Sequence, residues 1–250
     1  MNPMKRILPL LIALLTIACA TAQDAKLGDE AYRQGDYAAA IEQYEAVLAS
    51  GRTSADLHYN LGNAYYREGQ MANAILNYHR ALRLKPSMKD AKENLALAES
   101  HTTDRITPLP QLFLSRWLKD LRDGITPSAW RGIWLALLAV LGVCIVLFRI
   151  GRTVGQQKFG FVCGIVSLVL IAVATYFLIA STSHYNAHSE AIVMEPAISI
   201  KGSPEQQSVD KMLLHEGTMV VIEEELSSWY KIRIADGTTG WCESQSVERI

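Results

Sequence analysis

The strongest constraint in this sequence is an internal repeat, because the chain overlays itself when it is shifted by 34 residues. Each copy holds two segments with helical spacing of apolar residues, divided by a glycine. The matched pairs are Leu27 and Leu61, Gly28 and Gly62, Tyr32 and Tyr66, Gly35 and Gly69, Ala40 and Ala74, Ile41 and Ile75, Tyr44 and Tyr78, and Leu48 and Leu82. This period, with two helices in each copy, predicts a stack of antiparallel helical hairpins.

Small and large residues are arranged in the second copy as two closely packed helices require. Gly62 and Ala74 remove bulk where the helices meet, and Tyr65 and Tyr78 fill the space beside them. Pro86 cannot continue the preceding helix and begins the next one. The pattern therefore predicts tight packing within each hairpin.

These residues and the period resemble the tetratricopeptide repeat. The resemblance implies an all-α repeat domain over residues 23–100. Its two units are residues 21–54 and 55–88, and a further helix over residues 88–100 is expected to cap the open end of the stack.

A stack of such repeats has a concave face that is lined by the first helix of each hairpin. The resemblance implies that this face binds a peptide or protein partner. The alternative is an ordinary solvated face that carries a few aromatic side chains. The candidate partner-binding residues are Asp29, Tyr32, Arg33, Asp56, Tyr59, Asn63, Tyr66 and Arg67.

The first 22 residues predict a secretory signal peptide. Lys5 and Arg6 precede a short apolar run, and Ala-Thr-Ala at residues 20–22 provides a cleavage site of small residues. Two alternatives are open: the segment is retained as an anchor, or Cys19 is a lipid-modified cysteine. A cleaved signal and a retained anchor both place the following residues on the exported side of the membrane.

Two apolar segments predict a transmembrane hairpin. Apolar residues make up 50% of a chain that also carries 24 basic and 25 acidic residues, so the apolar residues are concentrated in a few places. Residues 130–149 and 159–180 are each near the ~20 residues that a helix needs to cross a bilayer. A buried helix of a soluble core is the alternative, and the second long run so soon after the first argues against it.

The loop between these segments predicts the topology. Residues 150–158 include Arg152 and Lys158 but no acidic residue, so the positive-inside rule places the loop in the cytoplasm. The signal peptide leads independently to the same topology. Both interpretations place the repeat domain and the C-terminal segment on the exported side.

Residues 101–128 form a linker that contains an amphipathic helical pattern over residues 109–123. One interpretation is a helix that lies in the membrane interface, with Trp117 at the headgroups. The other interpretation is a helix packed against the repeat domain. The apolar face of the pattern consists of Phe113, Leu114, Trp117, Leu118 and Leu121.

Residues 189–250 contain short β-branched and aromatic runs separated by Gly, Pro and Ser. In residues 229–234 the side chains alternate as in a strand with one buried face. The stretches "EGT", "WYKIRIADGTTGW" and "VERI" resemble bacterial SH3-like domains, which implies a small β-barrel that binds peptides or cell-wall fragments. Trp229 and Trp241 are candidate ligand-stacking residues, and a structural role for both is the alternative.

The sequence contains no motif that predicts catalysis. It has no phosphate-cradling glycine loop, no HExxH and no nucleophile elbow. A net charge of −1 gives no reason to expect nucleic acid as a partner. We therefore predict a non-enzymatic protein with no cofactor and no metal site. The expected fold class is a multidomain membrane protein with all-α tetratricopeptide helical hairpins, a two-helix transmembrane hairpin and a small all-β SH3-like barrel.

The order of these parts, together with the stretches "ITPLP" and "LFLSRW", resembles the BatE family of Bacteroides aerotolerance operon proteins. The resemblance implies a bacterial inner-membrane protein with both modules in the periplasm. It also implies partners among membrane proteins with von Willebrand A domains and a MoxR-type AAA+ ATPase. The implied function is a scaffold or adaptor in an aerotolerance or envelope-stress complex. The alternative is a peptidoglycan sensor or anchor that acts through the SH3-like domain.

Overall fold

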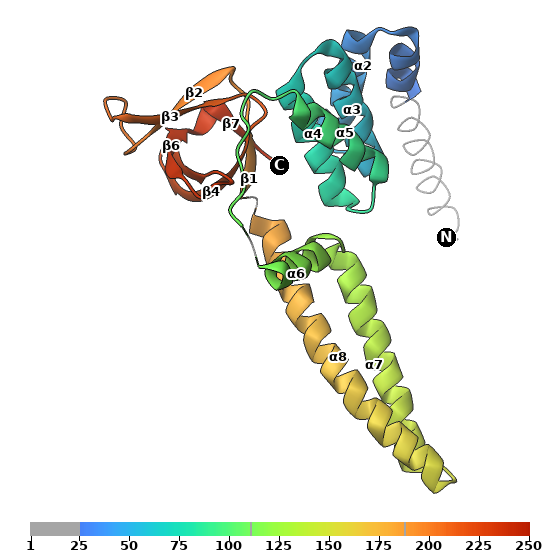
Figure 1. The fold of residues 1–250 in the computed structure, drawn as a ribbon. Coiled ribbons are helices and arrows are strands. Elements are labelled where there is room, and N and C mark those ends of the chain that lie inside the picture. The colour runs from blue at the N-terminus through green and yellow to red at the C-terminus, as the bar shows by residue number, and fades with distance from the viewer. Residues whose placement is uncertain (1–25, 111, 188) are drawn as a thin grey trace, which may run out of the picture. The chain divides into compact units, whose positions relative to one another are not determined.

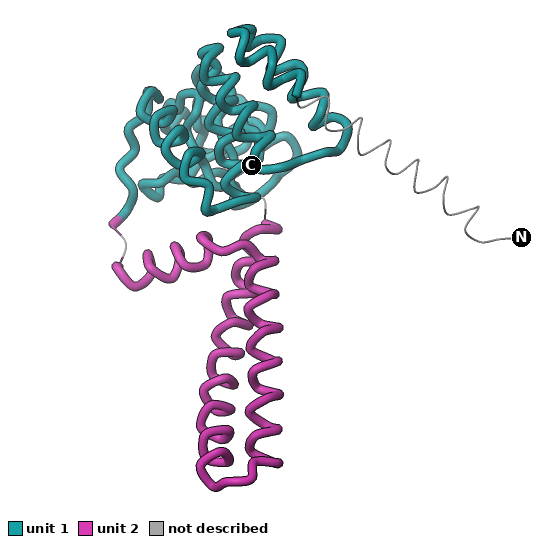
Figure 2. Tube along the Cα trace, turned by 90° about the vertical axis from the view of Figure 1, so that its right-hand side faces the viewer, with its two compact units in different colours: residues 1–109, 189–250 teal, residues 110–188 magenta. Residues whose placement is uncertain are grey.

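The computed structural model describes residues 26–110, 112–187 and 189–250 (Figure 1). The predicted signal peptide and Cys19 lie outside these residues. The chain divides into two compact units, one formed by Met1–Leu109 with Ser189–Ile250 and the other by Pro110–His188 (Figure 2). The second unit is therefore an insertion within the sequence of the first.

The N-terminal part of the first unit is a stack of antiparallel helices (Figure 1). Residues 26–34 are helical, and this helix forms the first hairpin with α2. The helices that follow are α2 (Tyr37–Ala49), α3 (Ala55–Glu68), α4 (Met71–Leu84) and α5 (Lys89–Ser100). The helical repeat character predicted from the 34-residue period is confirmed, and α5 continues the stack beyond the second hairpin.

Short polar residues and glycines mark where these helices begin and end. The Asp36 side chain accepts a hydrogen bond from the Ala39 N–H at 3.0 Å, and the Ser54 side chain accepts one from the Leu57 N–H at 3.1 Å. Both bonds satisfy N–H groups that the first helical turn leaves without a partner. Gly69 ends α3 with a φ of +83°, a conformation that residues with a Cβ atom rarely adopt.

Glycine and tyrosine complement each other at the same place in both hairpins. A Cβ atom added to Gly28 would lie 2.5 Å from the Tyr44 ring, and one added to Gly62 would lie 2.8 Å from the Tyr78 ring. The two rings are only 2% and 1% exposed. The tyrosines therefore fill the space that the glycines leave, and their burial contributes to the stability of each hairpin.

The C-terminal part of the first unit is an antiparallel sheet with the strand order β3-β2-β6-β5-β4-β1-β7. The strands are β1 (Glu190–Val193), β2 (Ala197–Lys201), β3 (Asp210–His215), β4 (Met219–Leu226), β5 (Trp229–Arg233), β6 (Thr239–Glu243) and β7 (Val247–Arg249). The all-β character expected from the sequence is confirmed. The edge strands β3 and β7 do not pair with each other, so the sheet is open and the expected closed SH3-like barrel is not confirmed.

An extended segment, residues 102–109, lies against this sheet and is called the strap below. The Asp104 carboxylate accepts hydrogen bonds from the His215 N–H and the Thr218 hydroxyl, each at 2.7 Å, and its other oxygen lies 2.7 Å from His215 Nδ1. Ile106 packs against the hydrophobic core of the sheet, and the Leu109 N–H donates to a carbonyl beyond β5. The first part of the predicted linker is thus packed against the C-terminal module.

The second unit consists of α6 (Phe113–Asp123), α7 (Pro127–Ile150) and α8 (Val154–Ala187). Helices α7 and α8 pack along each other, with the rings of Trp130 and Phe177 stacked 4.9 Å apart. A Cβ atom on Gly160 would lie 2.8 Å from the Cys144 carbonyl oxygen, so this glycine permits the close contact. Both helices are long and apolar enough to cross a membrane, by length and composition alone.

Candidate functional site

In each of the two hairpins, the hydroxyl of a buried tyrosine donates a hydrogen bond to a polar side chain of the first helix. The Tyr44 hydroxyl donates to Asp29 Oδ1 at 2.7 Å, and the Tyr78 hydroxyl donates to Asn63 Oδ1 at 2.8 Å. Each pair is separated by 15 residues, and the two pairs are related by the repeat. Burial raises the pKa of both tyrosines, so these hydroxyls remain protonated donors.

The next helix in the stack adds a second donor to each polar residue. Asn60 Nδ2 donates to Asp29 Oδ1 at 3.2 Å, and Asn94 Nδ2 donates to Asn63 Oδ1 at 2.8 Å. Asn94 lies on α5, one repeat after Asn60. The sequence analysis did not select these two asparagines, although extending the 34-residue period into α5 would have paired them. In each repeat, one side-chain oxygen therefore accepts two hydrogen bonds: Asp29 Oδ1 in the first repeat and Asn63 Oδ1 in the second.

Two adjoining hollows of about 260 and 230 Å³ are lined by these hydrogen-bonded residues and their neighbours. They share Tyr32 and Asn63, so they form one continuous surface, which is called the groove below. The first hollow is lined by Tyr32, Tyr59, Asn63, Tyr66, Arg67, Tyr78, Asn94 and Leu97, and the second by Asp29, Tyr32, Arg33, Tyr44, Asn60 and Asn63. Tyrosines and side-chain amides dominate the walls.

The two arginines of the groove differ in what they contact. Arg33 forms an ion pair with Glu30 on its own helix, and this pair is exposed to solvent. The guanidinium of Arg67 lies over the ring of Tyr37, 5.0 Å from its centroid. Within the described part of the chain, no acidic side chain is paired with Arg67. Arg67 is therefore the cation of the groove that is open to an outside partner.

The hollows bring together seven of the eight residues that the sequence selected as partner-binding. Asp56 is the exception, because it is exposed in the first turn of α3 and lines neither hollow. The residues that the sequence analysis missed are Tyr44, Asn60, Tyr78, Asn94 and Leu97. The role of all these residues in binding stays a prediction.

The two tryptophans of the C-terminal module lie on neighbouring strands. Trp229 on β5 is opposite Glu243, and Trp241 on β6 is opposite Lys231. Because alternate residues share a face, the two rings are on the same face of the sheet in diagonal positions. Both are half-buried. The geometry is compatible with the structural role and with the ligand-stacking role.

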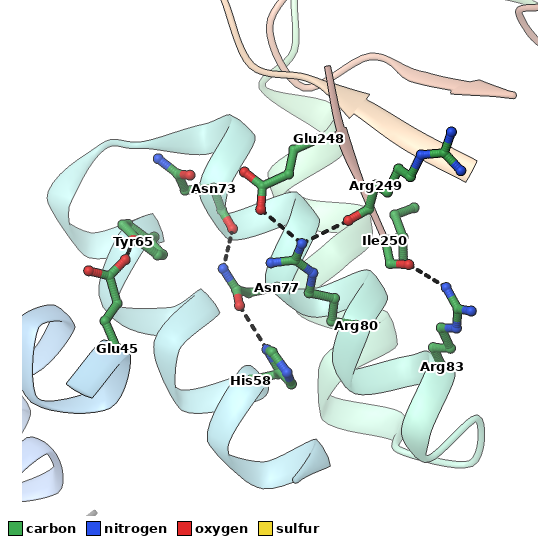
Figure 3. Close-up of polar contacts among 10 residues, drawn as sticks. All are labelled: Glu45, His58, Tyr65, Asn73, Asn77, Arg80, Arg83, Glu248, Arg249 and Ile250. Carbon is green, nitrogen blue, oxygen red and sulfur yellow. Dashed lines mark hydrogen bonds and ion pairs between the residues drawn. The ribbon is translucent and has the colours of Figure 1, made fainter. Parts of the chain in front are cut away.

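A second polar surface joins the helices to the sheet, on α4 (Figure 3). Arg80 Nη2 donates to Glu248 Oε1 at 2.8 Å and to the Arg249 carbonyl at 2.7 Å. Arg83 Nη1 donates to the Ile250 carbonyl. These carbonyls belong to and follow the edge strand β7, so the arginines cover backbone acceptors that an edge strand would otherwise expose.

Buried polar groups connect α3 and α4 beneath this surface (Figure 3). His58 Nδ1 lies 2.9 Å from Asn77 Oδ1, and His58 Nε2 lies 3.0 Å from the Thr53 hydroxyl. Burial disfavours the imidazolium and lowers the pKa of His58. The Asn77 amide also donates to the Asn73 carbonyl at 2.9 Å. The neutral imidazole thus has a partner for each ring nitrogen.

The described residues contain few features that would support metal binding or nucleophilic catalysis. Within residues 26–110, 112–187 and 189–250, no three His, Cys, Asp or Glu side chains gather as metal ligands. Cys242 is buried, and desolvation followed by the charges of Glu195 and Glu243 raises the pKa of its thiol to about 12. That thiol is therefore protonated and a poor nucleophile.

Comparison with known proteins identifies the helical region only. No curated protein matches the chain. Nothing found is specific to the BatE family. Residues 25–89 match the family model of the tetratricopeptide repeat. Such repeats are typically non-enzymatic interaction modules, so this region implies a role in protein–protein interaction.

Proposed function

We propose that this protein is a non-enzymatic, membrane-anchored scaffold whose groove binds a segment of a partner protein. The observation that carries the proposal is the groove itself. It combines half-buried tyrosine rings with Arg67, whose guanidinium has no acidic partner among the described residues. Aromatic side chains and arginine supply most of the affinity in protein interfaces, because they bury large areas and form strong directional contacts.

Helices α7 and α8 anchor the scaffold in the inner membrane of a bacterium, with the repeats and the sheet in the periplasm. Three observations support this topology. The helices have sufficient length and apolar composition, and the connecting loop is basic. The segments before and after the hairpin also form one compact unit, as is expected when both lie on the same side of the membrane.

The C-terminal sheet acts as an SH3-like module, although its edges remain open. In this proposal it extends the scaffold and makes a second contact with the same complex, which includes von Willebrand A domain proteins of an aerotolerance operon. The resemblance of the chain to the BatE family supports these partners. Two weak contacts on one compact unit reinforce each other, because the second contact forms at high effective concentration.

A peptidoglycan anchor is the second candidate, and the exposed parts of Trp229 and Trp241 on one face of the sheet favour it. Sedimentation with purified sacculi separates the two functions. A scaffold stays in the supernatant, whereas an anchor sediments and loses this property when both tryptophans are replaced by alanine.

Photo-crosslinking in cells tests the groove. A photoreactive amino acid at Tyr66, inside the groove, should give a defined crosslinked species, whereas the same amino acid at Asp56, on the same helix but outside both hollows, should not. The captured protein is then purified and its binding to the intact scaffold is measured directly. Equal capture from both positions, or no saturable binding of the captured protein, would contradict the proposal.

A further inference from the structure

The centre of the groove offers an outside ligand several hydrogen-bonding groups that have no partner among the described residues. The oxygens Asp29 Oδ1 and Asn63 Oδ1 each already accept two hydrogen bonds from within the stack. The hydroxyls of Tyr32 and Tyr66 have no hydrogen-bond partner in the described residues, and the same is true of the Asn63 amide NH₂. The two hydroxyls can accept as well as donate, and Asp29 Oδ2 and the amide oxygens of Asn60 and Asn94 are also available as acceptors.

Arg67 makes donors the majority in the groove, because a guanidinium has five N–H donors and no acceptor. Its stacking on Tyr37 holds it at the edge of the first hollow without engaging its N–H groups in an ion pair. An ordinary extended peptide presents N–H and C=O groups in equal number. A ligand with more free C=O than N–H groups would use the donors of Arg67 and Asn63 more fully than such a peptide does.

We propose that the groove binds a proline-rich segment of the partner in the polyproline II conformation. This inference rests on the proposed function and specifies its ligand. A proline residue has no N–H, and the carbonyls of a polyproline II helix form no internal hydrogen bonds. The segment is thus rich in free acceptors and poor in donors, which matches the polar groups of the groove.

The shape of the groove fits the same ligand. The side chains of Tyr32, Tyr59 and Tyr66 are half-buried and line the first hollow, which gives it partly accessible aromatic walls. Proline rings pack well on such surfaces, and aromatic-lined grooves are a recurrent mode of polyproline II recognition. Two adjoining hollows of about 260 and 230 Å³ give room for successive proline residues on either side of Asn63. The segment also loses little conformational entropy on binding, because it is extended beforehand.

Fluorescence anisotropy with the purified full chain tests this ligand class. The probes are a labelled decaproline and a labelled Gly-Ser decamer of the same length. We expect decaproline to bind at least about tenfold more tightly, because the second probe carries N–H donors and has no ordered conformation. Tyr66→Phe should weaken decaproline binding about threefold to tenfold by removing one donor, and Tyr66→Ala should weaken it further by removing the ring.

Tyr176→Phe is the matched control, since Tyr176 lies on α8 outside the groove, and it should leave the affinity unchanged. Thermal melts of all variants verify that they fold. Equal affinity for the two probes would overturn the proline-rich ligand while leaving the groove as a protein-binding site. Absence of binding by either probe, together with no specific crosslink from Tyr66, would overturn both proposals.

Discussion

The helical region has two polar surfaces that differ in how fully their hydrogen-bonding groups are engaged. On α4, Arg80 donates to Glu248 and to a backbone carbonyl of the sheet. On α3, Arg67 stacks on a tyrosine and has no acidic partner among the described residues. Both arginines lie on the second repeat, yet one contributes to an interface inside the molecule and the other lies in a groove.

This difference separates a structural surface from a candidate binding surface better than residue type does. Arginine occurs on both surfaces, so residue type alone does not distinguish them. What distinguishes them is whether the donors have partners within the chain. Substitutions should therefore lower stability on the α4 surface and leave it nearly unchanged at groove residues that have no hydrogen-bond or ion-pair partner within the described residues, such as Arg67.

The largest effect is expected where α4 meets both the repeat core and the sheet. Ile75 is 0% exposed, and its Cδ1 atom lies where a side chain on Gly217 would clash. Ile75→Ala should lower the free energy of unfolding by about 2–5 kcal/mol, because it leaves a cavity between the two parts. Leu97→Ala, which truncates a half-exposed groove residue, is the control and should cost less than about 1 kcal/mol in chemical denaturation. Similar losses of unfolding free energy in both variants would contradict the difference between the α4 surface and the groove.

A smaller loss is expected from the strap. Asp104→Ala leaves the His215 N–H and the Thr218 hydroxyl without their acceptor, which should cost about 1–3 kcal/mol. Glu93→Ala, an exposed position on α5, is the control. Hydrogen exchange should show faster opening of the His215 amide in the Asp104 variant. Unchanged protection of that amide would contradict the role of the strap.

The two arginines give the most direct test of the comparison. Arg80→Gln should lower the free energy of unfolding by about 1–2 kcal/mol, because the ion pair is partly exposed but the backbone carbonyl also loses its donor. Arg67→Gln should change it by less than about 0.5 kcal/mol. Urea titrations of the two variants in parallel give both values. A larger loss for Arg67→Gln would show that the groove is a structural surface.

The smallest effect is a pH dependence beneath the α4 surface. Because burial lowers the pKa of His58, the unfolded chain, with an ordinary histidine pKa of about 6.5, binds the proton more readily than the folded chain. Stability should be fully present above this value and should fall as the pH drops below it. Urea midpoints at pH 7.5 and 5.5 measure the loss, and His58→Gln should reduce it. An identical loss in that variant would assign the effect to other groups.

Sequence periodicity predicted the helical part of the fold because its determinants are local. The pairs of glycine and tyrosine recur at the repeat period and need no knowledge of the rest of the chain. The same period reaches α5 and would have identified Asn94. Seven candidate groove residues are brought together for this reason, since helical spacing places them on one side of each first helix.

The strap and the open sheet could not be predicted in the same way. Asp104 is separated from His215 by 111 residues, and the strap itself has no apolar period. Alternation along a strand shows which face is buried, but it does not show whether the two edge strands meet. The predicted barrel closure therefore had no support in the sequence, and in the structure α4 and the strap cover parts of the sheet instead.

The first unit is formed by two segments of the chain that the second unit separates in sequence, and this has a consequence for biosynthesis. The ribosome makes α4 before the apolar helices α7 and α8, and the strands that cover Ile75 emerge only after both. During this interval the repeats are already able to pair their own helices, but Ile75 and the two arginines of α4 await their partners. Chaperones of the compartment would meet this uncovered face first, and arrest of translation within the hairpin would leave it permanently uncovered.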